Sequence, residues 1–221
     1  MIWIIYNFLF PFGFLLFLPY FILRMSRRGG YKRNFGQRLG FYDADTRQKL
    51  AEGGRVWLHA VSVGEVFVAF QFMEEMRRRR PAVRFMLSTT TSTGYALAGK
   101  RLARQDVLIY FPVDFVLVMR RVLNLARPSA ILLVECEFWP NMIRMARQRG
   151  IPVALVNGRI SARSFKGYHR LRLFMRPLLQ GMNGLGAQSE ADARRLLDLG
   201  APPNLVKALG KGVLKVMSKM G

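Results

Sequence analysis

The sequence has few of the residues that build disulfide scaffolds and zinc sites. Its 221 residues include one cysteine, Cys136, and two histidines, His59 and His169. A lone cysteine cannot form an internal disulfide framework, and one thiol with two imidazoles falls short of a tetrahedral zinc site. We therefore expect no metal site, and a reducing compartment for most of the chain.

Acidic residues are also scarce. The chain has 13 Asp and Glu against 35 Lys and Arg, a formal net charge of +22. High net charge indicates disorder when hydrophobicity is low, but 51% of these residues are hydrophobic, so the chain has enough apolar residues to fold. Such a charge excess attracts polyanions, which makes nucleic acid and an anionic membrane the two candidate partners.

Charged side chains are absent from residues 1–23, MIWIIYNFLFPFGFLLFLPYFIL. As a helix this stretch is long enough to cross a hydrocarbon core of about 30 Å. The basic segment 24–54 follows it, and the positive-inside rule then leaves the rest of the chain in the cytoplasm. We expect a membrane anchor at 1–23 and a juxtamembrane segment at 24–54. Because Pro11 and Pro19 weaken a straight span, an interfacial anchor and a buried apolar helix are the alternatives.

From residue 55 onward, short apolar runs alternate six times with segments of helical period. This alternation indicates βαβ crossovers and a parallel sheet with helices on both faces, so we predict an α/β, Rossmann-like domain over residues 55–210. The predicted strands are 55–61, 84–88, 107–113, 130–135, 151–157 and 184–188. The predicted helices are 65–80, 91–104, 114–126, 140–150, 161–180 and 189–200.

Glycine-rich phosphate-binding motifs are missing. No G-x-G-x-x-G follows the first predicted strand, and no G-x-x-x-x-G-K-[ST] occurs in the chain, so dinucleotide and P-loop functions lose their main support. In open parallel sheets, ligands bind beyond the carboxyl ends of the strands. The residues that follow each apolar run are therefore the candidates.

Ser62 and Glu65 follow the first predicted strand, with Gly64 between them. S-x-x-E before an apolar stretch is a capping box, in which both side chains satisfy backbone donors at a helix start. The alternative function for Glu65 is a general base that takes a proton from a substrate hydroxyl.

A run of hydroxyl residues follows the second predicted strand and includes Thr90, Thr91 and Ser92. Hydroxyls and backbone N–H groups at a helix start can bind a phosphate or a carboxylate, but they also cap helices without any ligand. The pattern alone leaves both interpretations open.

Two acids, Glu135 and Glu137, stand at the end of the fourth predicted strand and just beyond it. Carboxylates beside a buried strand cost desolvation energy unless they are paired, and they share one side if the strand continues. The pattern favours a functional pair over ion pairs with the abundant Arg. After the fifth strand, Asn157 and Arg159 combine a turn with a guanidinium that suits anion binding, although a surface role for Arg159 fits equally well.

Together these segments resemble the 3-deoxy-D-manno-octulosonic acid (Kdo) transferase family. The resemblance depends on the order and spacing of the motifs over nearly the whole chain. The motifs are GQRLG at 36–40, WLHAVSVGE at 57–65, STTTSTG at 88–94, ECEFWPN at 135–141 and NGRIS at 157–161.

The resemblance implies an inverting glycosyltransferase of the GT-B type, which moves Kdo from CMP-Kdo to the lipid A precursor at the cytoplasmic face of the inner membrane, without a metal or other cofactor. It matches the family's general base to Glu65, the acid that supports the transition state to Glu135, and a later family lysine to Lys215. Family members carry a second Rossmann-like domain that makes most donor contacts. The chain therefore corresponds to the acceptor-binding half, with residues 211–221 as a truncated or divergent start of the inter-domain region.

Two other functions compete with catalysis. A membrane-anchored module could bind anionic glycolipid without transferring sugar. Nucleic-acid binding through the positive charge is the weaker alternative, because no nucleic-acid motif accompanies that charge and residues 1–23 point to lipid.

Overall fold

The computed structural model describes residues 2–28 and 32–210, which form one parallel sheet surrounded by helices. The strands are β1 (Val56–His59), β2 (Phe85–Thr89), β3 (Val107–Tyr110), β4 (Ala130–Val134), β5 (Val153–Gly158), β6 (Gly184–Ala187) and β7 (Val206–Ala208). The helices that precede β1 are α1 (Ile2–Arg28), the 3₁₀ helix η1 (Lys32–Leu39) and α2 (Ala44–Ala51). Those that follow it are α3 (Val63–Arg79), α4 (Ser92–Arg101), α5 (Val116–Ala126), α6 (Pro140–Gln148), α7 (Ala162–Arg170), α8 (Arg172–Leu179), α9 (Glu190–Asp198) and the 3₁₀ helix η2 (Pro203–Leu205).

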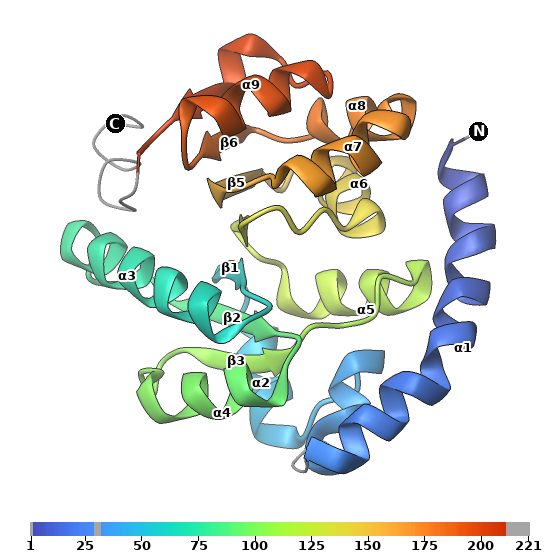
Figure 1. The fold of residues 1–221 in the computed structure, drawn as a ribbon. Coiled ribbons are helices and arrows are strands. Elements are labelled where there is room, and N and C mark those ends of the chain that lie inside the picture. Colours follow the sequence, from blue (N-terminus) through green and yellow to red (C-terminus); the bar gives the residue numbers. More distant parts are fainter. Residues whose placement is uncertain (1, 29–31, 211–221) are drawn as a thin grey trace.

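The strands lie in the order β3-β2-β1-β4-β5-β6-β7, and every neighbouring pair is parallel. The chain enters the sheet at β1, builds outward to β3, then crosses back to β4 and builds the other half (Figure 1). Such a doubly wound sheet has its topological switch point between β1 and β4, where ligands bind beyond the strand ends. The predicted Rossmann-like α/β fold is confirmed.

Helices cover both faces of this sheet. All four residues of β1 are buried, as expected for a central strand with helices on each side. Leu58 belongs to one core with Val66 of α3, whereas its neighbour Trp57 belongs to the other core with Met119 of α5. Successive side chains of a strand point to opposite faces. Both cores are therefore built on the same few strands.

All six predicted strands are present, with two differences in the elements. β7 is a seventh strand, short and without a fully buried residue, so it carries no apolar run that would have predicted it. The predicted helix at 161–180 is two helices, α7 and α8, because the backbone leaves the helical region at Leu171 (φ −102°, ψ 24°).

Part of the segment 24–54 packs on the sheet. The side-chain oxygen of Gln37, in η1, accepts a hydrogen bond of 2.9 Å from the backbone N–H of Tyr110 at the end of β3. Leu50 of α2 is 1% exposed and belongs to the same core as Trp57. This segment therefore contributes directly to the domain that holds the site.

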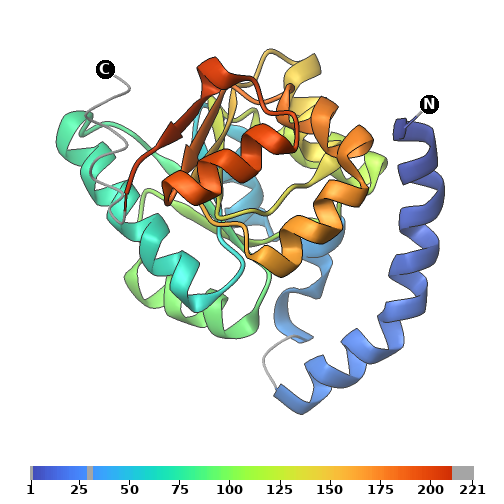
Figure 2. The ribbon, with the colours of Figure 1, turned by 45° about the horizontal axis from the view of Figure 1, so that its top comes forward.

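Helix α1 lies along one flank of the domain and bends partway along its length (Figures 1 and 2). Pro11 and Pro19 lie inside it, and proline is a usual cause of helix bends. Within residues 2–28 and 32–210, no helix combines the length and the apolar character required to traverse a bilayer, so the predicted anchor at 1–23 is not seen as a membrane-spanning helix. One side of α1 instead contacts the domain, where the rings of Trp3 and Phe174 lie 6.3 Å apart.

Candidate active site

Glu65 caps α3 directly after the central strand. Its two carboxylate oxygens accept the backbone N–H groups of Val61 (2.8 Å) and Ser62 (3.2 Å), and its own N–H donates to Ser62 Oγ (3.3 Å). The predicted capping box is therefore present, and Glu65 is 6% exposed. Two backbone donors fix the carboxylate in position, while each oxygen keeps further acceptor capacity.

Gly64 lies in the first turn of α3 and is exposed to solvent. A Cβ added at this glycine would meet one nearby atom, Ser62 Oγ at 3.9 Å. Packing therefore does not require a glycine here. Because Gly64 has no side chain, a ligand can approach the backbone beside Glu65.

The hydroxyl residues after β2 differ in their hydrogen bonds. Thr91 caps α4 by accepting the N–H of Gly94 (3.1 Å), and its hydroxyl donates to the carbonyl of Val61 (3.0 Å), which ties this loop to the Glu65 loop. Ser92 is the first residue of α4. By contrast, the buried Oγ1 of Thr90 has no hydrogen-bond partner among the described residues.

Glu135 and Glu137 lie at the neighbouring strand end. The strand stops at Val134, because Glu135 takes a left-handed backbone conformation (φ 61°) that non-glycine residues rarely adopt. The N–H of Glu135 still donates to the carbonyl of Val156 (3.0 Å) in β5. The alternation argument required a continuing strand, so it does not apply to this pair.

Glu65, Glu135 and Glu137 nevertheless form one carboxylate cluster. Burial is the main cause that raises the pKa of Glu137 to about 7, and the negative charges of Glu65 and Glu135 add to it. Burial first, and the charge of Glu65 second, also raise the pKa of Glu135, while Arg159 acts in the opposite direction. Partial burial and negative charge thus both oppose ionisation of Glu135 and Glu137.

The loop after β5 adds the remaining predicted residues. Asn157 is left-handed (φ 56°), and its side-chain oxygen accepts a weak hydrogen bond from Gln188 (3.4 Å). Arg159 is exposed, and it makes no ion pair within the part of the chain that the structure describes. Its positive charge acts to lower the pKa of Glu135.

A buried histidine, His59, ends the central strand at this edge of the sheet. His59, the last residue of β1, is 0% exposed, and its ring stacks on Phe111 with a centroid separation of 3.9 Å. Burial lowers its pKa to about 3, so the ring is neutral at physiological pH. Phe111 also packs against Trp139 at 4.7 Å, which joins the loops that follow β3 and β4.

Asp114 is a carboxylate at the same edge that the sequence reasoning missed. It is 0% exposed and accepts hydrogen bonds from the N–H groups of Asn141 and Met142 and from the hydroxyl of Tyr6, each of 2.9 Å. Burial raises its pKa to about 7. An available signal was its place directly after the third apolar run, which matches the place of Glu135 after the fourth.

The family model for 3-deoxy-D-manno-octulosonic-acid transferase (Kdo transferase) matches residues 33–215, a range that contains every motif described above. The chain belongs to this family. The match includes Lys215, which lies outside the residues that the structure describes, so the structure gives no position for this predicted residue.

Several curated Kdo transferases are similar to this family member. That of *Bordetella pertussis* is 34% identical over 183 residues, which cover 80% of this chain and 42% of the relative. That of *Chlamydia pneumoniae* is 28% identical over 199 residues, 90% of this chain and 45% of the relative. A bifunctional glycosyltransferase/methyltransferase of *Fusobacterium nucleatum* is 33% identical over 160 residues, 70% of this chain and 24% of that protein. The chain therefore spans less than half the length of these relatives.

Among solved structures, the UDP-GlcNAc 2-epimerase of *Neisseria meningitidis* bound to UDP-GlcNAc matches with a TM-score of 0.49. It is 15% identical, and the match covers 75% of the Kdo transferase-family chain and 49% of the epimerase.

Proposed function

We propose that this chain is the acceptor-binding half of an inverting, GT-B-type Kdo transferase, which moves Kdo from CMP-Kdo to the lipid A precursor. The carboxylate cluster at the carboxyl edge of the sheet is the observation that carries this proposal. Its repulsion and the left-handed backbone of Glu135 both cost free energy, and such costs accumulate at functional sites. Most donor contacts then belong to a second domain, in keeping with the greater length of the relatives.

Glu65 acts as the general base in this mechanism. It takes the proton from an acceptor hydroxyl while that oxygen attacks the anomeric carbon of Kdo from the face opposite the departing CMP. The N–H groups of Val61 and Ser62 hold the carboxylate in one orientation, so the proton acceptor is fixed before the substrate arrives. The exposed backbone at Gly64 provides the approach for the acceptor.

Glu135 and Glu137, the other members of the cluster, affect the charge that an anionic donor meets at the site. Kdo and CMP are both anionic, and ionised carboxylates near them would repel the donor. Because burial and neighbouring charges raise the pKa of Glu135 and that of Glu137, these groups hold a proton more readily than ordinary glutamates. Each can then donate a hydrogen bond to the transition state, and Arg159 is the cation at the edge of the cluster for an anionic substrate group.

We also propose that α1 lies in the interface of the inner membrane, on its cytoplasmic side. One side of the helix is bound to the domain, and its exposed large apolar side chains are each at least half exposed: Ile4, Ile5, Phe8, Leu9, Phe12, Leu15, Leu16 and Phe17. A helix with its apolar side buried in the headgroup boundary fits this arrangement, and the net charge of +22 favours anionic lipid. Phe8→Glu with Leu16→Glu should abolish sedimentation with phosphatidylglycerol vesicles, whereas Leu197→Glu on α9 should not.

A silent glycolipid-binding module is the second candidate function. Both oxygens of Glu65 already accept backbone N–H groups, one of them in the capping box, which gives this residue a complete structural role. The experiment that separates the two functions measures Kdo transfer from CMP-Kdo by this chain joined to the carboxyl-terminal half of the *Bordetella* relative. Transfer supports the enzyme, and binding of the acceptor without transfer supports the module.

A further inference from the structure

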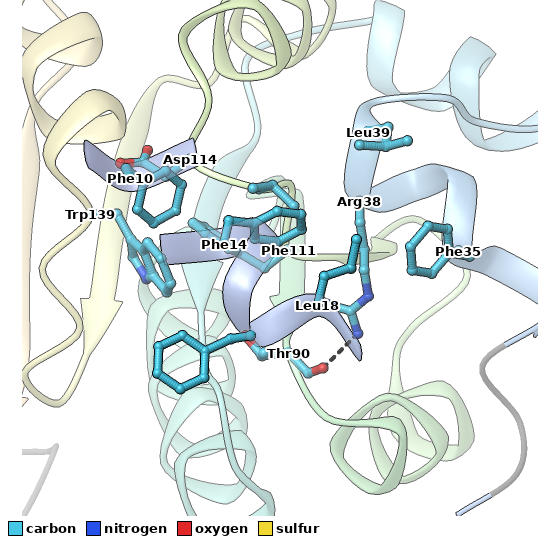
Figure 3. A pocket seen from close by; sticks show the side chains of 12 residues that line it. Phe10, Phe14, Leu18, Phe35, Arg38, Leu39, Thr90, Phe111, Asp114 and Trp139 are labelled. Carbon is cyan, nitrogen blue, oxygen red and sulfur yellow. Dashed lines mark hydrogen bonds between the residues drawn. The ribbon is translucent and has the colours of Figure 1, made fainter. Parts of the chain in front are cut away.

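An apolar chamber of about 400 Å³ lies between α1 and the carboxyl edge of the sheet (Figure 3). Helix α1 contributes Phe10, Phe14 and Leu18 to its wall, and the loops after β3 and β4 contribute Phe111 and Trp139. We call this space the α1 chamber. Its volume lies within the range of about 300–1,000 Å³ that is usual for small-molecule sites.

Two buried donors in this wall have no acceptor. Trp139 Nε1 and Thr90 Oγ1 are both shielded from solvent, and neither has a hydrogen-bond partner among the residues that the structure describes. Native proteins rarely leave such groups unpaired, so each calls for an explanation. Arg38 and Asp114 also line the space, but both are hydrogen-bonded within the fold, so its surface is mainly apolar. Such a surface with two unpaired donors suits a ligand that is mostly hydrocarbon and carries an acceptor oxygen at one end.

The outer wall of the α1 chamber is fixed to the domain. Tyr6 donates to Asp114, and Asn141 Nδ2 donates to Asn7 Oδ1 at 2.7 Å. The ring of Phe115 lies edge-on to that of Phe14, at 5.2 Å. Helix α1 thus closes the chamber as part of the folded domain.

The α1 chamber and the carboxylate cluster both draw residues from the loop that follows β4, and the loop that follows β2 connects the two. Trp139 is two residues beyond Glu137, and Thr90 precedes Thr91, whose hydroxyl is bonded to the Glu65 loop. A sugar ring at the carboxylates therefore has the chamber within reach of its substituents. A nucleobase fits this space poorly, because Arg38 and Asp114 in the wall already bond within the fold, and several polar edge groups of the base would lack partners.

We propose that the α1 chamber binds one acyl chain of the glycolipid acceptor. Trp139 Nε1–H and Thr90 Oγ1–H donate to the carbonyl oxygen that joins this chain to the sugar. The site would recognise the acyl chain of the acceptor as well as its sugar and phosphates, so a deacylated sugar would bind more weakly. This inference rests on the proposed function, because it takes the acceptor to be an acylated sugar.

The test compares the binding of acylated and deacylated glucosamine disaccharide bisphosphates by the full chain, using titration calorimetry below the aggregation concentration. Val113→Trp places an indole in the chamber, which Val113 lines, and Leu117→Trp places one on the exposed surface of α5 as the control. Each excluded methylene weakens affinity about fourfold. Val113→Trp should therefore weaken binding of the acylated compound at least about tenfold, with the deacylated compound unaffected and the control unchanged.

A second variant keeps the test decisive if Val113→Trp does not fold. Trp139→Phe keeps an aromatic ring but removes the donor, so it should weaken binding of a compound with carbonyl-linked chains severalfold and leave an ether-linked compound unchanged. Equal affinity of the parent chain for acylated and deacylated compounds would overturn the inference and leave the proposed function standing. Failure to bind either compound would overturn both.

Discussion

Asp114 and Glu137 have the same raised pKa, about 7, in opposite surroundings. Asp114 accepts three hydrogen bonds and joins α1 to the start of α6. The carboxylate of Glu137 has no hydrogen bond within the described part of the chain, and it faces the charges of Glu65 and Glu135. The pKa alone therefore does not separate a carboxylate that the fold holds by hydrogen bonds from one that has none.

Backbone strain also differs between the carboxylate cluster and the loop that carries Asp114. Three non-glycine residues have positive φ in the described chain, and two of them, Glu135 and Asn157, lie at the carboxylate cluster. No such residue occurs in the loop that carries Asp114. Strain of this kind costs about 1–3 kcal/mol per residue and persists where the surrounding fold enforces it. The backbone at the cluster is therefore strained, whereas the backbone of the loop that carries Asp114 has no such strain.

The largest expected effect comes from Glu65→Gln. Removing a general base should lower Kdo transfer by about 10²–10⁴-fold in the chain joined to a donor domain, because the amide cannot accept the acceptor's proton. Stability should fall by about 1 kcal/mol, since Gln retains one oxygen for the capping box. Steady-state rates and thermal unfolding measure the two effects.

The matched control is Asp43→Ala, which removes the side-chain cap of α2 far along the chain from the cluster. It should lose a similar amount of stability and keep full transfer. If Glu65→Gln behaves in the same way, Glu65 is a cap and the general base is another group.

Asp114→Asn should destabilise the protein by about 1–3 kcal/mol. Asn offers one acceptor oxygen where three donors converge, so at least one buried N–H or O–H loses its partner. Because Tyr6 is one of these donors, α1 should also become easier to cleave with protease. Denaturant unfolding and limited proteolysis test this prediction, and unchanged values in both would remove the distinction between the two carboxylates.

Glu137→Gln should act with the opposite sign. Its folded pKa, about 7, lies above its ordinary value of 4.5, so the folded state holds the proton more tightly and its stability falls as the pH rises from about 4.5 to 7. A neutral amide avoids that loss. We expect stabilisation of about 1 kcal/mol at pH 8 and no change at pH 4, measured by chemical unfolding at both pH values. Destabilisation at pH 8 would show that Glu137 has a structural partner.

The sequence predicted the sheet well because its strands are short apolar runs between helical segments. It could not predict β7, which has no such run, or the break at Leu171, where no proline or glycine marks the change. Residues 1–23 lack charge, which predicts contact with an apolar medium. That absence does not separate a helix that crosses a bilayer from one that lies along a protein surface.

The site was predictable to the extent that it follows strand ends. That rule placed Glu65, Glu135 and Arg159 at one edge, and the capping box was correctly foreseen as well. The left-handed conformation of Glu135 depends on long-range packing around β4 and β5, so no local pattern shows it. The same rule would have found Asp114, but only the structure shows that its hydrogen bonds are all satisfied by the fold.

Gly64→Ala gives the smallest and most selective expected effect. Alanine should raise stability by about 0.4–1 kcal/mol, because the site has room for a methyl group and the unfolded chain loses freedom. Yet that methyl group would project where the acceptor approaches the backbone beside Glu65, so the KM for the acceptor should rise severalfold with a smaller change in kcat. Gly167→Ala, in the exposed α7 with no atom near its added Cβ, is the matched control and should stabilise without changing KM. Identical kinetics for the two variants would place the acceptor elsewhere on the sheet edge, because only a bound sugar distinguishes the two glycines.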